Sequence, residues 1–398
     1  MFAHKDAELC SFGRPPDPAP MPAIQLFEDE ACIGLHPLNL IDGTAGIRAG
    51  ALTQEERWNR LSLSARECGH DWPEDIRINA RWMPDGSTLG LISALGSGMA
   101  MMQDGVLLAA RGDGGGDRLE VTSDKAQFLI EHANQLFTHL EGWILADMEQ
   151  AAQDWGCPPW SGDHPTAVYG PARDLKVSPD ATFRASSVNT EHGPVLIGPG
   201  AIIEPGVHLE GPLIIGQHSV VRMGARVSGP SVIGPHCKVG GEVKNVNFQG
   251  WSNKAHDGYL GNSVIGRWCN LGAGTISSNL KNTYGEVRQW NAASRRLEPT
   301  GLTFCGLLMG DHVKCGIGTT FNTGTVIDPA CVIFDAGFPP KHLPAFSWFD
   351  ARSGKGNLQD LDRMLVAAER TMARRGMTMG PAQRARLTQL HALRQSEG

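Results

Sequence analysis

The stretch IGPGAIIEPGVHLEGPLIIGQHSVVRMGARVSGPSVIGPHCKV, residues 197–239, decides the fold of this chain. Every sixth residue in it is a branched aliphatic: Ile197, Ile203, Leu209, Ile215, Val221, Val227, Ile233 and Val239. A helix repeats its apolar face every ~3.6 residues and an ordinary strand every two, so a strict period of six indicates short strands separated by fixed corners. This period predicts a parallel β-helix built from hexapeptide repeats.

The corners and the later coils follow the same pattern. Glycine and proline follow several of the aliphatic residues, as in Ile197-Gly198-Pro199, where a tight corner leaves little room for a Cβ. The period resumes further along the chain at Ile265, Leu271, Met309, Cys315, Phe321 and Ile327. We therefore assign residues 159–345 to the β-helix.

Two breaks in the period are candidates for function. Between Asn245 and Val264 the sextet is lost and polar residues are dense, which indicates a site for chemistry. From Ser277 to about Leu302 the sequence is polar and reads as a loop that leaves the coil. Insertions in repeat proteins map to loops, often on the binding face. A surface loop without function is the alternative for both stretches.

Composition limits the class of protein. A chain of 398 residues with 41% hydrophobic content can bury more than one core, so we expect two or three domains. The net charge is −7 and no basic stripe is present, which argues against nucleic acid as a partner. The nine cysteines form no C-x-x-C pair, so we expect reduced thiols, no metal site and a cytoplasmic location. No apolar run approaches the ~20 residues of a membrane span.

The flanking regions differ from the repeat. Residues 1–22 are rich in proline and predict a disordered leader. Residues 23–158 mix helix and strand signals and predict an α/β domain. They include capping-box spacing from Thr53 to Glu56, a hairpin turn at Asp104-Gly105 and a helical pattern from Ser123 towards Gln153. Beyond Pro344 the pattern turns helical, so residues 346–398 predict a helical segment.

Residues 254–261, Lys-Ala-His-Asp-Gly-Tyr-Leu-Gly, carry a resemblance to a known family. Together with Asn-Leu-Gly-Ala-Gly-Thr at 270–275, they resemble the acetyltransferase half of bifunctional bacterial UDP-N-acetylglucosamine pyrophosphorylase/glucosamine-1-phosphate N-acetyltransferase. The layout from Ile24 to Pro340 is similar to sugar nucleotidyl transferases with a fused left-handed β-helix. The resemblance implies a left-handed coil, a homotrimer, acetyl-CoA as co-substrate and a sugar phosphate or nucleotide sugar as partner, with no membrane contact.

The resemblance also implies substrate-handling residues. It places His256 as the general base, because an amino sugar must lose a proton from its ammonium before the nitrogen can attack a thioester. Lys244 and then Arg222 are the candidates for binding a sugar phosphate. Tyr259 becomes a candidate for binding the sugar, with a packing aromatic as the alternative.

Five further positions complete the predicted site. Asn270 and Asn279 are candidates for substrate binding, with turn or ladder asparagines as the alternative. Backbone N–H groups near Gly272 and Ala273 could stabilise the oxyanion that forms from acetyl-CoA. Lys341 is a candidate for a CoA phosphate contact made from a neighbouring chain, against an ordinary surface lysine.

The front region departs from active nucleotidyltransferases. Those enzymes usually carry a loop of the form G-x-G-T-x-M, in which glycines let backbone amides approach a triphosphate, and no such loop follows Ile24. We therefore expect an acyltransferase, most simply one that N-acetylates an amino-sugar 1-phosphate. The alternatives are a sugar-1-phosphate nucleotidyltransferase that uses the β-helix for trimerisation, with Mg²⁺ required only then, and a trimeric binding protein without catalysis.

Overall fold

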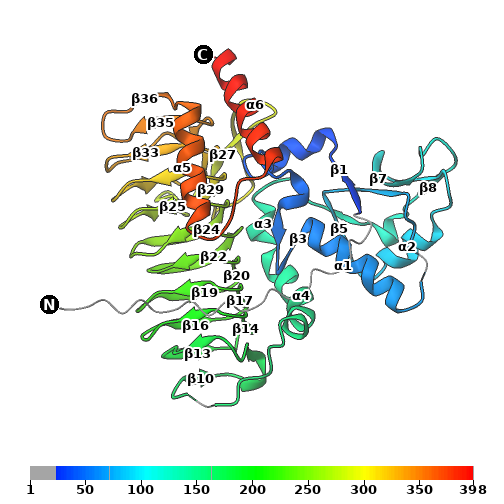
Figure 1. Ribbon diagram of the computed structural model, residues 1–398, viewed down its shortest axis with the longest axis horizontal. Helices are drawn as coiled ribbons and strands as arrows, with labels where there is room; N and C mark the ends of the chain where they lie inside the picture. Colours follow the sequence, from blue (N-terminus) through cyan, green and yellow to red (C-terminus); the bar gives the residue numbers. More distant parts are fainter. Residues whose placement is uncertain (1–23, 71, 163, 398) are drawn as a thin grey trace.

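The computed structural model describes residues 24–70, 72–162 and 164–397. In this part of the chain a front domain lies against one side of a parallel β-helix, and two C-terminal helices lie beside the far coils (Figure 1). The leader predicted for residues 1–22 lies outside the described residues.

The coil has three walls, called A, B and C here, whose short strands pair in parallel from one coil to the next. Wall A holds β11 (Leu175–Val177), β14 (Val195–Ile197), β17 (Leu213–Ile215), β20 (Ser231–Ile233), β29 (Leu307–Met309), β32 (Thr325–Ile327) and β34 (His342–Leu343). Wall B holds β12 (Thr182–Phe183), β15 (Ile202–Ile203), β18 (Val220–Val221), β21 (Lys238–Val239), β23 (Asn253–Lys254), β25 (Asn270–Leu271), β30 (Lys314–Cys315), β33 (Val332–Phe334) and β35 (Ser347–Asp350). Wall C holds β10 (Ala167–Tyr169), β13 (Ser187–Asn189), β16 (His208–Glu210), β19 (Arg226–Ser228), β26 (Ile276–Ser277) and β31 (Thr320–Phe321). Two longer strands, β22 (Glu242–Phe248) and β24 (Tyr259–Ile265), run from wall C into wall A.

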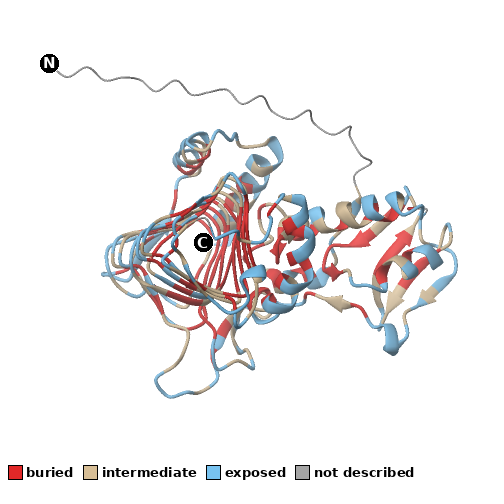
Figure 2. Ribbon diagram, turned by 90° about the horizontal axis from the view of Figure 1, so that it is seen from below, coloured by how far each residue is buried: buried red, intermediate tan, exposed pale blue. Residues whose placement is uncertain are grey.

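The aliphatic residues of the six-residue period form the buried core inside the coil. Figure 2 looks along the coil and marks the buried residues of its walls in red. Ile203, Val221 and Val239 stack in register on wall B, while Leu209 and Val227 stack on wall C. The predicted parallel β-helix is confirmed, because burial of one aliphatic side chain per wall is what the period of six specifies.

The first break in the period is not a break in the coil. Phe248, Lys254, Leu260 and Ile265 occupy the next inward positions, and β23 pairs with β21 so that Lys254 lies beside Val239. The alternative of a surface loop is therefore wrong for this stretch, because it continues the coil. The six-residue period is not visible here in the pattern of apolar residues, because a lysine occupies one of the inward positions.

The second break is a true insertion. Between β26 and β29 the chain leaves the coil and forms an antiparallel hairpin from β27 (Arg288–Asn291) and β28 (Arg296–Pro299). The loop predicted for this stretch is confirmed. The hairpin of β27 and β28 within it was not predicted.

Wall A is covered by the front domain. Its strands bury their outward side chains as well as their inward ones: Leu196, Ile214, Val232, Val264, Leu308 and Val326. The first three pack against α4 (Leu140–Asp154), and the last three pack with α3 (Gln135–Thr138) and its neighbours. Polar contacts join the same surfaces, since Asn247 and Gln249 donate to the carbonyl of Arg48 at 2.9 and 3.0 Å. The backbone of Arg48 therefore adds polar contacts to the apolar ones between the two domains.

The front domain contains a mixed five-stranded sheet in the order β1-β4-β7-β6-β8. The strands are β1 (Gln25–Phe27), β4 (Ile76–Asn79), β6 (Ala100–Gln103), β7 (Val106–Arg111) and β8 (Arg118–Glu120). Shorter elements complete the domain: β2 (Arg48–Ala49), β3 (Leu52–Thr53), α1 (Gln54–Glu67), β5 (Trp82–Met83), α2 (Thr88–Ala94) and β9 (Phe128–Leu129). The Thr53–Glu56 capping box opens α1 and Asp104-Gly105 turns β6 into β7, as predicted.

Two helical predictions need correction. The helix predicted from Ser123 begins only at Leu140, because β9 and the short α3 come first. The C-terminal segment also starts with strands, since β35 pairs with β36 (Lys355–Leu358) before α5 (Leu361–Ala373) and α6 (Pro381–Glu397). Among the described residues, every helix is too short or too polar to cross a membrane.

Candidate functional site

A polar cluster lies on the outer face of wall C where β22 and β24 run side by side. Lys244 is paired with Gly261 in register and is exposed. The half-buried Tyr259 folds along its own strand, so that its hydroxyl lies over Gly261. A side chain at residue 261 would overlap that hydroxyl. Glycine at this position therefore lets the tyrosine hydroxyl lie close to the strand that carries Lys244.

Asn279 brings the start of the insertion into the same cluster. Its Nδ2 donates to the Tyr259 hydroxyl at 2.9 Å and to Asn262 Oδ1 at 2.6 Å. Burial raises the pKa of Tyr259, so the phenol keeps its proton and can donate a hydrogen bond at neutral pH. The structure thus brings together three predicted site residues, Lys244, Tyr259 and Asn279, which are up to 35 residues apart in the chain.

His256 lies at the exposed corner between walls B and C, just before β24. The residue that fixes this corner is Lys254, which is 1% exposed and points into the coil. Its ammonium donates to the carbonyls of His256 at 2.8 Å and of Gly240 at 3.0 Å. Burial lowers the pKa of Lys254 to about 8. A lysine is needed here because an apolar side chain could donate to neither carbonyl.

Gly272 and Ala273 lie at the same corner, one coil further on. The N–H of Gly274 donates to the carbonyl of Asp257 at 3.2 Å, which joins the two corners. The N–H of Gly272 donates to the carbonyl of Cys315 at 3.0 Å and is therefore committed to the coil. An oxyanion at this corner would have to be bound by another N–H. Of the two residues predicted to stabilise the oxyanion, Ala273 therefore remains as the candidate.

Three other predicted residues lie apart from the wall C cluster. Arg222 is at the B–C corner, two coils before His256, and its guanidinium pairs with Glu204 at 2.6 Å. Asn270 is on the outer face of wall B, where its Oδ1 lies 3.5 Å from Asn253 Nδ2. Lys341 precedes β34 of wall A and donates to the carbonyl of Arg288 in the hairpin. Within one chain, these three residues do not contact the cluster.

Sequence reasoning missed the roles of two residues near the site. Lys254 was named only as part of a polar stretch and of the motif, and its burial was not predicted, although it lies six residues after the inward Phe248. Asn262 has a left-handed backbone, φ 48°, where β24 bends from wall C into wall A. Asparagine tolerates this conformation, and its amide oxygen accepts a hydrogen bond from Asn279. This role depends on the bend in β24, which the sequence did not predict.

Comparison with known proteins bears on the front domain first. Residues 24–154 match the family model of the sugar nucleotidyl transferases. The predicted resemblance is thereby confirmed for this part of the chain. The polypeptide also matches the bifunctional protein GlmU of Methanocaldococcus jannaschii, with 38% identity over 78 residues. A bifunctional sugar-1-phosphate nucleotidylyltransferase/acetyltransferase of Sulfurisphaera tokodaii matches with 36% identity over 86 residues.

These relatives are matched over short segments. The matches cover 20% and 22% of this chain, and 18% and 21% of the respective relatives. Two solved acyltransferases show remote similarity, both with a TM-score of 0.19. One is a variant of AntD, an N-acyltransferase from Bacillus cereus in complex with dTDP and coenzyme A, with 9% identity over 54% of this chain and 92% of that one. The other is UDP-N-acetylglucosamine acyltransferase from Arabidopsis, with 14% identity over 55% and 77%.

Proposed function

We propose that this protein is an acyl-CoA-dependent acyltransferase that N-acetylates an amino-sugar 1-phosphate. The observation that carries the proposal is the wall C cluster, in which Lys244 lies beside the bonded pair Tyr259 and Asn279 and close in sequence to the exposed His256. The two curated relatives are named as bifunctional proteins, and one name includes acetyltransferase. That agreement supports an activity of the β-helix in addition to that of the front domain.

The chemistry requires one base and one cation. The sugar ammonium loses one proton to the imidazole of His256, and the freed amine forms a bond to the thioester carbonyl carbon. The C–S bond then breaks and CoA leaves as its thiolate, which takes one of the two protons left on the nitrogen, so the products are a neutral amide and free CoA thiol. Lys244 supplies a point charge for the phosphate, and the Tyr259 hydroxyl with Asn279 offers hydrogen bonds to the sugar.

In this proposal, neighbouring chains of a homotrimer contribute groups to the acetyl-CoA site. The Ala273 corner faces solvent beside His256, and Arg222 and Asn270 lie on surfaces that a neighbouring coil could cover. Burial and then the nearby charges of Lys281 and Arg288 lower the pKa of Lys341. The three side chains form a cationic group suited to a CoA phosphate of a neighbouring chain. A homotrimer would place these groups at shared clefts, because a closed ring of coils joins different walls of neighbouring copies.

A second function, sugar-1-phosphate nucleotidyl transfer by the front domain, is favoured by the family match over residues 24–154. It would need Mg²⁺ to bind the triphosphate. Release of pyrophosphate from UTP and a sugar 1-phosphate would establish it. Because the front domain covers apolar side chains of wall A, the two activities are best separated with point variants of the full chain rather than by truncation.

The test is release of free thiol from acetyl-CoA across a panel of amino-sugar 1-phosphates, with and without UTP. His256→Ala should lower kcat by about 10²–10⁴-fold, the usual contribution of a positioned base, and higher pH should restore part of the rate. The control is His208→Ala, which removes another exposed histidine from wall C. Near-normal turnover of His256→Ala at neutral pH would overturn the proposed mechanism.

A further inference from the structure

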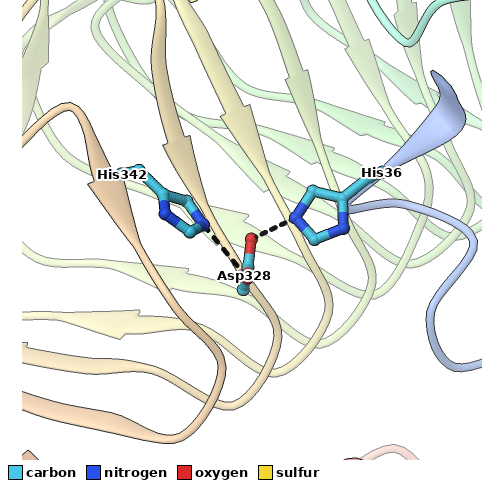
Figure 3. Close-up of side chains that lie close together, drawn as sticks. All are labelled: His36, Asp328 and His342. Carbon is cyan, nitrogen blue, oxygen red and sulfur yellow. Dashed lines mark hydrogen bonds and ion pairs between the residues drawn. The ribbon is translucent and has the colours of Figure 1, made fainter. Parts of the chain in front are cut away.

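A group of metal-ligating side chains lies where the front domain meets wall A, far from His256 in the fold. His36 comes from the front domain, and Asp328 and His342 come from neighbouring coils of the β-helix (Figure 3). His36 Nε2 lies 2.6 Å from one Asp328 oxygen, and His342 Nε2 lies 3.2 Å from the other. Both imidazoles therefore point their Nε2 atoms at one carboxylate.

The spacing suits a single metal ion. Zinc binds imidazole nitrogen and carboxylate oxygen at about 2.0–2.2 Å, so two ligands of one ion are about 3.0–3.4 Å apart at angles between 90° and tetrahedral. Of the three pairs of ligand atoms, His342 and Asp328 already have this separation, and His36 and Asp328 need to open by a few tenths of an ångström. The third pair is formed by the two imidazoles, and all the ligand atoms lie within 4.8 Å of one another. Two histidines and one carboxylate form a donor set that divalent transition metals prefer.

The surroundings hold these ligands in place. Their side chains are 15%, 8% and 16% exposed for His36, Asp328 and His342 respectively. The indole of Trp290, from the hairpin, stacks on the His342 ring at 4.2 Å between centroids and 7° between planes. A buried carboxylate is costly unless it is paired, so this position favours a bound cation or two proton-donating imidazoles.

The group also borders a cavity. A space of about 470 Å³ lies between the front domain and the hairpin, and His36 and Trp290 are both in its wall. Glu131, His132 and Asn134 line it from the front domain, and Gln289 and Thr300 from the hairpin. Three protein ligands leave at least one position of a metal open, and the cavity can supply an oxygen ligand to that position.

We propose that His36, Asp328 and His342 bind one divalent transition-metal ion, with Zn²⁺ as the best match, and that the ion's open position faces the cavity between the domains. The ion would join the front domain to the coil through His36. None of these residues belongs to the wall C cluster, so the metal site lies apart from the proposed base and sugar-binding residues, while Lys341 of the proposed CoA contact directly precedes His342. The sequence shows no such motif because His36 and Asp328 are 292 residues apart.

The test is equilibrium dialysis of the chelator-treated full-length protein against Zn²⁺ and Co²⁺, with bound metal measured by mass spectrometry. We expect one ion per chain and a rise of Tm on Zn²⁺ addition. Asp328→Asn and His342→Gln should each weaken binding at least tenfold and abolish the rise of Tm. His132→Gln changes a histidine that lines the same cavity but does not belong to the group. This variant should leave metal binding and the rise of Tm unchanged.

The alternative is a purely structural role, in which both histidines donate hydrogen bonds to Asp328 and no metal binds. If the wild-type protein binds less than stoichiometric metal, or if both variants bind as tightly as the wild type, the proposal is overturned. The wild-type titration alone decides the first point, so a variant that fails to fold does not prevent the test. Cobalt adds a control, because thiolate charge-transfer bands would show that cysteines bind the ion instead.

Discussion

The buried ammonium of Lys254 lies 2.8 Å from the carbonyl oxygen of His256 and donates a hydrogen bond to it. The same ammonium donates to Gly240 on the preceding coil, so it ties two consecutive corners together. A lysine inside an aliphatic stack is expensive, since it must give up its hydration. The bonds to two corner carbonyls explain its place there: it positions the backbone that carries the proposed base.

Lys254→Met should therefore lower kcat for acyl transfer while the coil stays folded. Methionine fills a similar volume in the stack but donates to neither carbonyl, and a small misplacement of a catalytic group can cost up to about a hundredfold. Steady-state kinetics should show the loss in kcat with KM for the sugar phosphate nearly unchanged. Lys238→Met, which removes an exposed lysine of the preceding coil, is the control. Equal kcat in the two variants would exclude a positioning role.

Folding stability should depend on pH through the same residue. Burial lowers the pKa of Lys254 to about 8 from 10.5, so between these values the unfolded chain holds a proton that the folded chain has lost. Stability then rises with pH across this window, and the whole gap corresponds to about 3 kcal/mol. The measurement is denaturant unfolding of the wild type and of Lys254→Met at pH 7.5 and pH 10. From the lower to the higher pH, the free energy of unfolding of the wild type should increase relative to that of the variant. A constant difference at both pH values would contradict this assignment.

Lys244→Ala should raise KM for the sugar phosphate about tenfold or more, with a smaller effect on kcat. A hydrogen bond to a charged partner contributes about 1.5–3 kcal/mol, and it is present in both the ground state and the transition state. Initial rates over a range of sugar phosphate concentrations provide the measurement. Lys238→Ala serves as the matched control on wall B, and an unchanged KM in Lys244→Ala would remove Lys244 from the site.

Gly261→Ala should disturb the sugar site without unfolding the protein. The new methyl group would overlap the Tyr259 hydroxyl, which must then move away from Asn279. Because that hydroxyl ends a long side chain, it can move at little cost, and Tm should change little. We expect a several-fold rise of KM for the sugar phosphate. Gly285→Ala, where the nearest atom to the added Cβ is 3.7 Å away, should have the kinetics of the wild type.

The coil was predictable because its period is local, whereas the contacts between the domains are not. Each inward aliphatic repeats six residues after the last, and the wall strands follow directly. The candidate residues of the wall C cluster, Lys244, Tyr259 and Asn279, came from the family resemblance that the motif at residues 254–261 carries. The pair of His36 and Asp328 could not be predicted, since only the docking of the front domain brings these residues together.

One signal of that docking was present in the sequence. Three wall A strands, β14, β17 and β29, are apolar at all three positions, as in Leu213-Ile214-Ile215 of β17. A strand that is apolar at every position is typical of burial on both faces. Wall B strands place exposed residues at the outward position, as with the 40% exposed Ile202. The contrast between the two walls shows which face of the coil another domain covers.

Ile214→Asp should therefore separate the domains, while Ile202→Asp should not. Ile214 is 1% exposed and packs against α4, so an aspartate there buries an unpaired carboxylate and should cost about 3 kcal/mol or more. Ile202 occupies an outward position on wall B, where a carboxylate remains hydrated. Limited proteolysis should release the front domain from Ile214→Asp but leave Ile202→Asp as resistant as the wild type. Equal resistance of the two variants would show that the apolar face of wall A does not hold the front domain in place.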